Sequence, residues 1–230
     1  MKLVLFDCDG TLVDSGNFIH RCMAESFVDA GLTPPELAET HSIIGLSLPL
    51  AIAQLLGREP DAEVDWLTAR YKENFVRLRA APDFSEPLYD GILPLLTELG
   101  QKDDILLGLV TGKSRRGVSA VFEKHGIGHH FGVVRTADDC PSKPHPAMVL
   151  ESCAKMGIGP DRTIVIGDAI YDMQMARSAG ALAAGVSWGY HDGPGLLQAG
   201  AHHLLNAPHE LHFILDAIDV AATELEKPHA

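Results

Sequence analysis

The stretch that decides the fold is KLVLFDCDGTLVDS, residues 2–15, in which a nearly continuous apolar run ends abruptly in acidic residues. The run 2–6 is typical of a strand that is buried on both faces of a parallel sheet. Asp7 and Asp9 follow it, separated by one residue. Successive side chains of an extended chain alternate in direction, so both carboxylates point the same way while Cys8 points toward the core.

Further apolar segments, rich in β-branched residues, each end at a polar residue or a glycine. They cover 105–111, 132–136, 163–168 and 181–188. Helical patterns lie between them, at 92–100, 115–126, 145–157 and 171–179. This alternation predicts a doubly wound, Rossmann-like α/β fold with a parallel sheet. In such folds ligands bind beyond the carboxyl ends of the strands.

Residues 16–86 break this alternation, because they contain helix-like stretches and no convincing strand. The stretches cover 17–30, about 47–57 and 62–80, with breaks at GLTPP and GREPD. We therefore expect an all-helical insertion at 16–86 in an α/β domain made of 1–15 and 87–230. The final segment, ELEKPHA, is expected to be frayed.

The composition narrows the classes of partner. The formal net charge of −13 argues against nucleic acid and against an anionic membrane, because phosphate-rich surfaces are bound by basic proteins. The cysteines are widely spaced and form no C-x-x-C pair, and the apolar N-terminal run is too short for a signal peptide. These features predict a cytoplasmic protein. We expect a monomer or a homodimer, and the sequence leaves both open.

Acidic residues follow the first and fourth of the predicted strands, and the carboxyl ends of parallel strands meet at one edge of a sheet. They are Asp7, Asp9, Asp168 and Asp172. Four carboxylates in one crevice repel each other strongly, and a bound divalent cation would relieve that repulsion. A set of carboxylate ligands points to Mg²⁺ as the cofactor.

The same edge is expected to bind a phosphoryl group. Thr111 supplies a hydroxyl after the second strand, Lys143 an ammonium group from the loop SKPHP, and the segments around Gly10 and Gly112 supply backbone N–H groups. These groups can neutralise the oxygens of a phosphoryl group during its transfer. Lys113 either donates to the phosphate as well or caps the helix that follows it.

A carboxylate can serve as the nucleophile by forming an aspartyl-phosphate. Asp7 and Asp9 can both face the phosphate, so one can attack while the other carries the leaving-group proton. The residues alone leave open which does which. Two other motifs fail: an EF-hand would need Gly at Leu12 and Glu at Phe18, and a P-loop would need Gly at Leu107.

Four segments of the chain together resemble the four motifs of the haloacid dehalogenase superfamily and occur in the same order. They are DCDGTLVDS, VTGKS, SKPHP and GDAIYDMQMARSAG. The resemblance covers nearly the whole chain, and it implies that the helical insertion is a cap. It implies that Asp7 is the nucleophile and Asp9 the general acid and base. Mg²⁺ would be held by Asp7, the backbone carbonyl of Asp9 and Asp168, with Asp172 supporting the metal shell and Lys143. Thr111 and Lys143 would bind the phosphoryl group.

Within the superfamily, the chain most resembles the phosphoglycolate phosphatase group. The implied activity is hydrolysis of a small phosphorylated metabolite, either phosphoglycolate-like or a sugar phosphate. One alternative is a β-phosphoglucomutase-like enzyme, in which an arginine stands where this chain has Leu48. The other is a non-catalytic binding protein, which the complete set of chemical residues disfavours. The candidate substrate contacts in the cap are His20, His41, Ser47 and Arg77.

Overall fold

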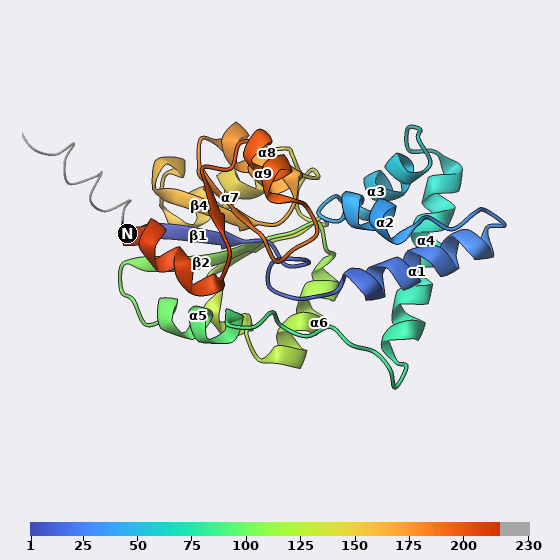
Figure 1. The fold of residues 1–230 in the computed structure, drawn as a ribbon, viewed down its shortest axis with the longest axis horizontal. Helices are drawn as coiled ribbons and strands as arrows, with labels where there is room; N and C mark the ends of the chain where they lie inside the picture. Colours follow the sequence, from blue (N-terminus) through green and yellow to red (C-terminus); the bar gives the residue numbers. More distant parts are fainter. Residues whose placement is uncertain (217–230) are drawn as a thin grey trace, which may run out of the picture.

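A parallel six-stranded sheet forms the larger part of the molecule in the computed structural model, which describes residues 1–216 (Figure 1). The strand order is β3-β2-β1-β4-β5-β6, so β1 is central and the order reverses beside it. Such a reversal opens a crevice at the carboxyl ends of the strands. The strands are β1 (Lys2–Phe6), β2 (Ile105–Val110), β3 (Val133–Arg135), β4 (Thr163–Gly167), β5 (Leu182–Val186) and β6 (His203–Leu205).

Helices cover both faces of this sheet, which confirms the predicted doubly wound α/β fold (Figure 1). Val4 and Phe6 pack into the apolar cluster that contains residues of α5 and α6, and Leu3 and Leu5 pack into the one that contains residues of α7 and α8. Cys8 is buried on the Val4 side, as alternation along the strand predicts. These helices are α5 (Ile92–Leu99), α6 (Arg115–His125), α7 (Ala147–Met156), α8 (Ile170–Ala179) and α9 (Gly193–Gln198).

The sequence between β1 and α5 folds into helices that have an apolar cluster of their own and lie beyond the carboxyl ends of the strands (Figure 1). The longest of them is preceded by Asp61, whose carboxylate accepts hydrogen bonds from the N–H groups of Glu63 and Val64 and so caps the helix. These helices are α1 (Gly16–Asp29), α2 (Leu37–Ile43), α3 (Leu48–Leu55) and α4 (Ala62–Arg79).

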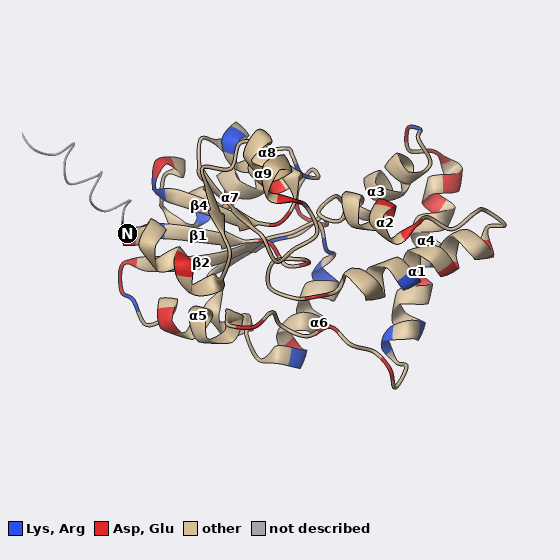
Figure 2. Ribbon diagram, viewed as in Figure 1, with Lys and Arg blue, Asp and Glu red and all other residues tan. Residues whose placement is uncertain are grey.

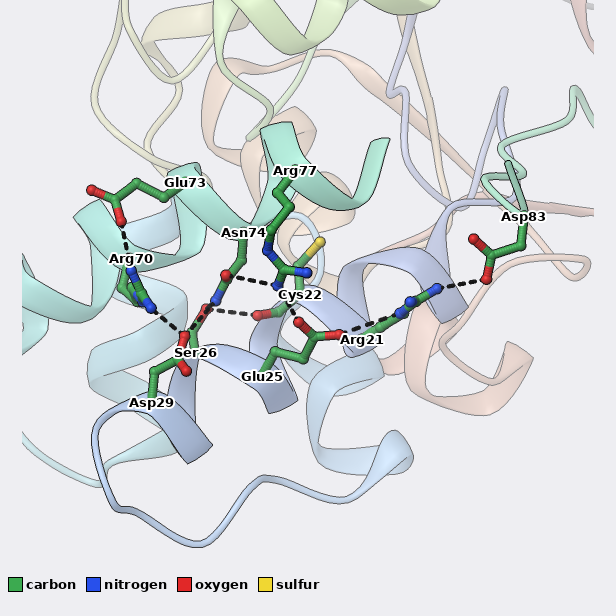
Figure 3. A network of polar contacts seen from close by, with 10 residues as sticks. All are labelled: Arg21, Cys22, Glu25, Ser26, Asp29, Arg70, Glu73, Asn74, Arg77 and Asp83. Atoms are coloured by element: carbon green, nitrogen blue, oxygen red, sulfur yellow. Dashed lines mark hydrogen bonds and ion pairs between the residues drawn. The ribbon is translucent and has the colours of Figure 1, made fainter. Parts of the chain in front are cut away.

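Helices α1 and α4 are joined by polar contacts along their exposed side (Figure 3). Arg70 donates to Asp29 at 2.7 Å, and Arg77 pairs with Glu25. Arg77 therefore lies against α1, and it is not among the residues that line the cavity described below.

The two connections between the helical part and the α/β part run side by side. The Asp14 N–H donates to the Pro87 carbonyl at 2.9 Å, and the Tyr89 N–H donates to the Leu12 carbonyl at 3.0 Å. An antiparallel bridge between Val13 and Leu88 lies between these bonds. The chain thus leaves the α/β part and returns to it at one point.

The sequence did not predict three short elements, β6, α2 and α9. Strand β6 has three residues at the edge of the sheet, too few for a recognisable pattern. Helix α2 has seven residues, and a capping box between Glu36 and Glu39 helps to start it. The predicted tail ELEKPHA lies outside the described residues.

Candidate active site

The central strands end at the edge of the sheet that faces α1–α4, and acidic positions of the chain lie there (Figure 2). Asp7 follows β1, Thr111 follows β2 and Asp168 follows β4. The pairing of β1 with β4 continues past the strand, since the Asp7 N–H donates to the Ile166 carbonyl at 2.9 Å. This bond fixes the backbone from which the Asp7 side chain projects.

Three carboxylates meet in the interior, from Asp7, Asp168 and Asp172. Each residue is at most 1% exposed, and one oxygen from each lies within 4.8 Å of the others. Burial raises the pKa of Asp7 to about 7; the positive charge of Lys143 opposes this rise and the charge of Asp172 adds to it. Burial and the neighbouring Asp7 also raise the pKa of Asp168 well above its usual range.

This cluster fits a hard divalent cation. Asp7 Oδ2 is buried and receives no hydrogen bond from the described residues. A buried carboxylate oxygen without a donor is costly, and a bound cation would remove that cost. Asp9 does not contribute its side chain to this group.

Asp168 is held by two hydrogen bonds. The Thr11 hydroxyl donates to its Oδ1 and the Tyr190 N–H to its Oδ2, each at 3.0 Å. Gly10 lies directly against it, with a φ of 83°, and a Cβ atom there would come within 2.1 Å of Asp168 Oδ2. The Gly10 N–H donates to the Val13 carbonyl, so it is engaged within the loop. The contribution of Gly10 is therefore the space that it leaves for Asp168.

Lys143 joins two of the three carboxylates. Its fully buried ammonium group lies 2.8 Å from Asp7 Oδ1 and 2.6 Å from Asp172 Oδ1. Burial alone would lower the pKa of Lys143, but Asp172 and Asp7 raise it above its usual value. The side chain thus stays charged and fixes the direction of the Asp7 carboxylate.

Thr111 and Gly112 lie where a phosphoryl group could reach them from the adjacent cavity. Thr111 Oγ1 accepts a hydrogen bond from the Lys113 N–H at 3.2 Å, which leaves the hydroxyl proton free to be donated. The carbonyl oxygens of Gly45 and Leu46 lie close to Gly112, and a Cβ atom added at Gly112 would be 2.5 Å from each of them. Any larger residue at 112 would push the α2–α3 loop away.

Asp9 has different partners from Asp7. Its Oδ1 accepts hydrogen bonds from the Ser15 hydroxyl at 2.6 Å and from the Lys113 ammonium group at 2.7 Å. Lys113 also lies 3.3 Å from Glu86 Oε1. Burial alone would lower the pKa of Lys113, but the carboxylates of Asp9 and Glu86 raise it. Lys113 does not cap the following helix, because Ser114 does so by accepting from a backbone N–H group.

A cavity of about 800 Å³ lies over these groups, between the sheet edge and the helices α1–α4. Asp7, Asp9 and Thr111 line its polar end. Of the remaining candidate contacts in the inserted helices, Ser47 lines the cavity, whereas His20 and His41 do not. His41 instead stacks on Tyr190.

Comparison with known proteins assigns this arrangement to a family. The family model for haloacid dehalogenase-like hydrolases matches residues 4–186. This span includes both acids that follow β1, Thr111, Lys143 and the two acids that follow β4. The chain belongs to the haloacid dehalogenase-like hydrolase family. The sequence-based recognition of this superfamily is thus confirmed.

Relatives in the haloacid dehalogenase-like family include proteins named as phosphatases. The chain is 31% identical over 220 residues to the N-acetylmuramic acid 6-phosphate phosphatase of Pseudomonas aeruginosa, covering 94% of this chain and 95% of that protein. It is 31% identical over 198 residues to the phosphoglycolate phosphatase of Agrobacterium fabrum, covering 84% and 83%. A crystal structure of a hydrolase from Pseudomonas syringae has a TM-score of 0.83 at 27% identity, covering 95% of this chain and 99% of that one.

The sequence did not predict the roles of several residues at this haloacid dehalogenase-like site. Ser15 and Tyr190 are polar residues of ordinary loops, yet Ser15 binds Asp9 and the Tyr190 hydroxyl accepts from the Ser15 N–H at 2.9 Å. Glu86 lies in a segment without a motif. Ser142 could have been noticed, because it precedes Lys143; its hydroxyl accepts from the Ser47 N–H at 2.8 Å.

The carboxylate cluster predicts that Mg²⁺ stabilises the fold. At pH 8 and saturating Mg²⁺, we expect the melting temperature to rise by about 5–10 °C, because a cation that binds only the native state shifts the folding equilibrium. The rise should be smaller at pH 5.5, since Asp7, whose pKa is raised to about 7, is then protonated and must lose its proton to bind the cation. Differential scanning fluorimetry measures both shifts.

Asp168→Asn should abolish this stabilisation, whereas Asp90→Asn, at an exposed acid, should leave it intact. An equal rise in all three proteins would contradict a metal site at the cluster.

Proposed function

We propose that the chain is a Mg²⁺-dependent phosphatase that hydrolyses a small-molecule phosphate monoester through an aspartyl-phosphate. The observation that carries this proposal is the position of Asp7, held by the Lys143 ammonium group at 2.8 Å and lining a cavity that Asp9 and Thr111 also line. We also propose that residues 16–86 act as the cap over this cavity and that 1–15 with 87–230 form the catalytic part.

In this proposal Asp7 attacks the phosphorus atom and the bond to the ester oxygen breaks. Asp9 donates its proton to that oxygen, so the alcohol leaves in neutral form. A water molecule then attacks the aspartyl-phosphate and gives its proton to Asp9, which releases inorganic phosphate and restores Asp7. Thr111 donates to a phosphoryl oxygen. The N–H of Gly112, for which residues 1–216 offer no acceptor, is a second donor.

Asp7, Asp168 and the backbone carbonyl of Asp9 would hold Mg²⁺, with Asp172 in support, and the cation would neutralise the phosphoryl oxygens. Lys143 contributes to the phosphate site by fixing Asp7 and by placing a positive charge behind it.

The cavity argues for a substrate larger than a two-carbon acid. Its volume of about 800 Å³ lies toward the upper end of the range of about 300–1,000 Å³ that is usual for small-molecule sites. Apolar side chains from the cap, including Met23, Tyr71 and Phe75, form much of its wall, and Lys72 and Arg116 add positive charge. We therefore propose a phosphorylated metabolite with a sugar-sized or larger alcohol. The relative named N-acetylmuramic acid 6-phosphate phosphatase supports this size.

The phosphomutase alternative is weaker. Leu48, at the position where the mutases carry an arginine, lines the cavity with an apolar side chain. An apolar side chain cannot pair with the second phosphate of a bisphosphate.

Release of inorganic phosphate from a panel of esters tests this function. We expect hydrolysis with Mg²⁺ and none with chelator, and a kcat/KM for N-acetylmuramic acid 6-phosphate or a hexose 6-phosphate at least about tenfold above that for 2-phosphoglycolate, because binding energy grows with the surface that the cavity encloses. Absence of hydrolysis on every ester would refute the phosphatase, whereas a preference for phosphoglycolate would refute only the size argument. Interconversion of sugar 1- and 6-phosphates would instead support the mutase.

Location and assembly remain predictions. No helix in residues 1–216 is both long and apolar enough to cross a membrane. We propose a cytoplasmic enzyme, as a monomer or a homodimer, that binds neither nucleic acid nor membranes, in keeping with its net charge of −13.

A further inference from the structure

Glu86 is a buried carboxylate that the proposed chemistry does not use. It is 0% exposed, and neither of its oxygens receives a hydrogen bond from the described residues. Among residues 1–216, two cations face its charge, Lys113 at 3.3 Å and Arg79 at 3.6 Å. The desolvation of a buried ion pair can cost more than the attraction returns, so the presence of Glu86 is not explained by the stability of the fold alone.

The position of Glu86 links two parts of the molecule. It belongs to the segment that returns from α4 to the α/β part, just before the paired connection at Pro87. Arg79 is the last residue of α4, and Lys113 precedes α6. The ammonium group of Lys113 thus lies between Glu86 and Asp9, within 3.3 Å of one and 2.7 Å of the other.

The two oxygens of Asp9 are not equivalent. Oδ1 accepts from Lys113 and from Ser15, whereas Oδ2 receives no hydrogen bond from the described residues. A protonated carboxyl has one oxygen that accepts and one that donates. Because Oδ1 already accepts two hydrogen bonds, Oδ2 is the oxygen left to contact a substrate, and Asp9 lines the cavity.

We propose that Glu86 and Lys113 are positioning residues that direct Asp9 Oδ2 toward the leaving group, an inference that rests on the proposed phosphatase function. As the bond between phosphorus and the ester oxygen breaks and Asp7 binds the phosphorus, the proton passes from Asp9 Oδ2 to the ester oxygen. Glu86 keeps the flexible Lys113 side chain on Asp9. Without Glu86, the ammonium group is free to turn into the cavity that Lys113 also lines.

The dependence of the rate on the leaving group distinguishes a role in positioning Asp9 from a general loss of folding or of substrate binding. Benzyl phosphate releases an alcohol that needs a proton, whereas 4-nitrophenyl phosphate, of similar size, releases a stable anion that does not. General acid catalysis contributes about 10²–10⁴-fold. For Glu86→Gln we expect kcat/KM to fall at least about tenfold for benzyl phosphate and less than about threefold for 4-nitrophenyl phosphate. Lys113→Met should show the same selectivity with a larger loss.

Two controls complete the experiment. Asp83→Asn changes a carboxylate in the same segment that binds the exposed Arg21, and it should leave both rates unchanged (Figure 3). The double variant Glu86→Gln/Lys113→Met should lose no more than Lys113→Met, because Glu86 acts through Lys113. It also keeps the test available if a buried, unpaired Glu86 prevents Lys113→Met from folding.

Equal losses on the two esters, or none on either, would overturn the positioning role while leaving the phosphatase in place. If the wild-type protein releases phosphate from neither ester nor from any member of the panel, the proposed function itself fails.

Discussion

Asp7→Asn is expected to reduce phosphate release by at least about 10⁴-fold. An amide is a poor nucleophile and cannot form the aspartyl-phosphate, and loss of a covalent nucleophile removes the reaction path rather than one contact. The fold should persist, because the amide has nearly the shape of the carboxylate and because burial, which raises the pKa of Asp7 to about 7, already favours a neutral group there. Measurement of kcat by phosphate release, with circular dichroism as a check on folding, tests this result.

Asp9→Asn is the matched control, since it changes the neighbouring carboxylate by the same single atom. It should lose most activity on benzyl phosphate and retain much more on 4-nitrophenyl phosphate, because only the first ester needs a proton on its leaving group. Asp7→Asn should lose both. If Asp9→Asn loses both and Asp7→Asn retains activity, the two roles are exchanged.

Lys143→Met is expected to lower the free energy of unfolding by about 3–5 kcal/mol at pH 8 in the absence of Mg²⁺. Removing one partner of a buried ion pair leaves the other charge buried and uncompensated, here the carboxylates of Asp7 and Asp172. Urea denaturation followed by circular dichroism measures the change.

The sign of the pH dependence follows from the raised pKa of Asp7. A carboxyl whose pKa is higher in the folded state than in the unfolded state stabilises the fold at low pH, and this contribution is lost as the pH rises through about 7. The cost of Lys143→Met should therefore be smaller at pH 5 than at pH 8. Lys102→Met, at an exposed lysine, should be neutral at both. Equal costs at the two pH values would show that lost packing, not charge, destabilises the variant.

The sequence predicted the site residues that directly follow strands of the sheet. An acid or a hydroxyl directly after a buried parallel strand must lie at the carboxyl edge of the sheet. The sequence alone therefore predicted that Asp7, Thr111 and Asp168 lie close together. Their burial and the pairing of Lys143 with Asp7 were not predictable from spacing. The burial and the ion pair depend on which side chains the packing of helices on the sheet removes from water. Short-range sequence patterns do not contain that information.

Residues that reach the site from irregular segments could not be predicted. In the sequence, Glu86 is an acidic residue of a linker that no motif marks. Its burial beside Lys113 follows only from the path of the chain back from α4. For Lys113, the sequence offered the phosphate or a helix cap, whereas its ammonium group binds Asp9. Strand β6 and helix α2 were too short for periodicity to separate them from loops.

The antiparallel bridge between Val13 and Leu88 has a consequence for how this enzyme could change over time. Because the chain departs and returns at adjacent positions, whatever lies between them can be lengthened, shortened or replaced without moving β1 or Asp7. Longer insertions add little closure entropy, about 0.6 kcal/mol for each doubling of length. Selectivity for the alcohol can thus evolve in the inserted helices while the bond-breaking machinery stays the same. Glu86 marks a limit to that freedom, because an exchanged segment would have to supply a carboxylate for Lys113 at its return point.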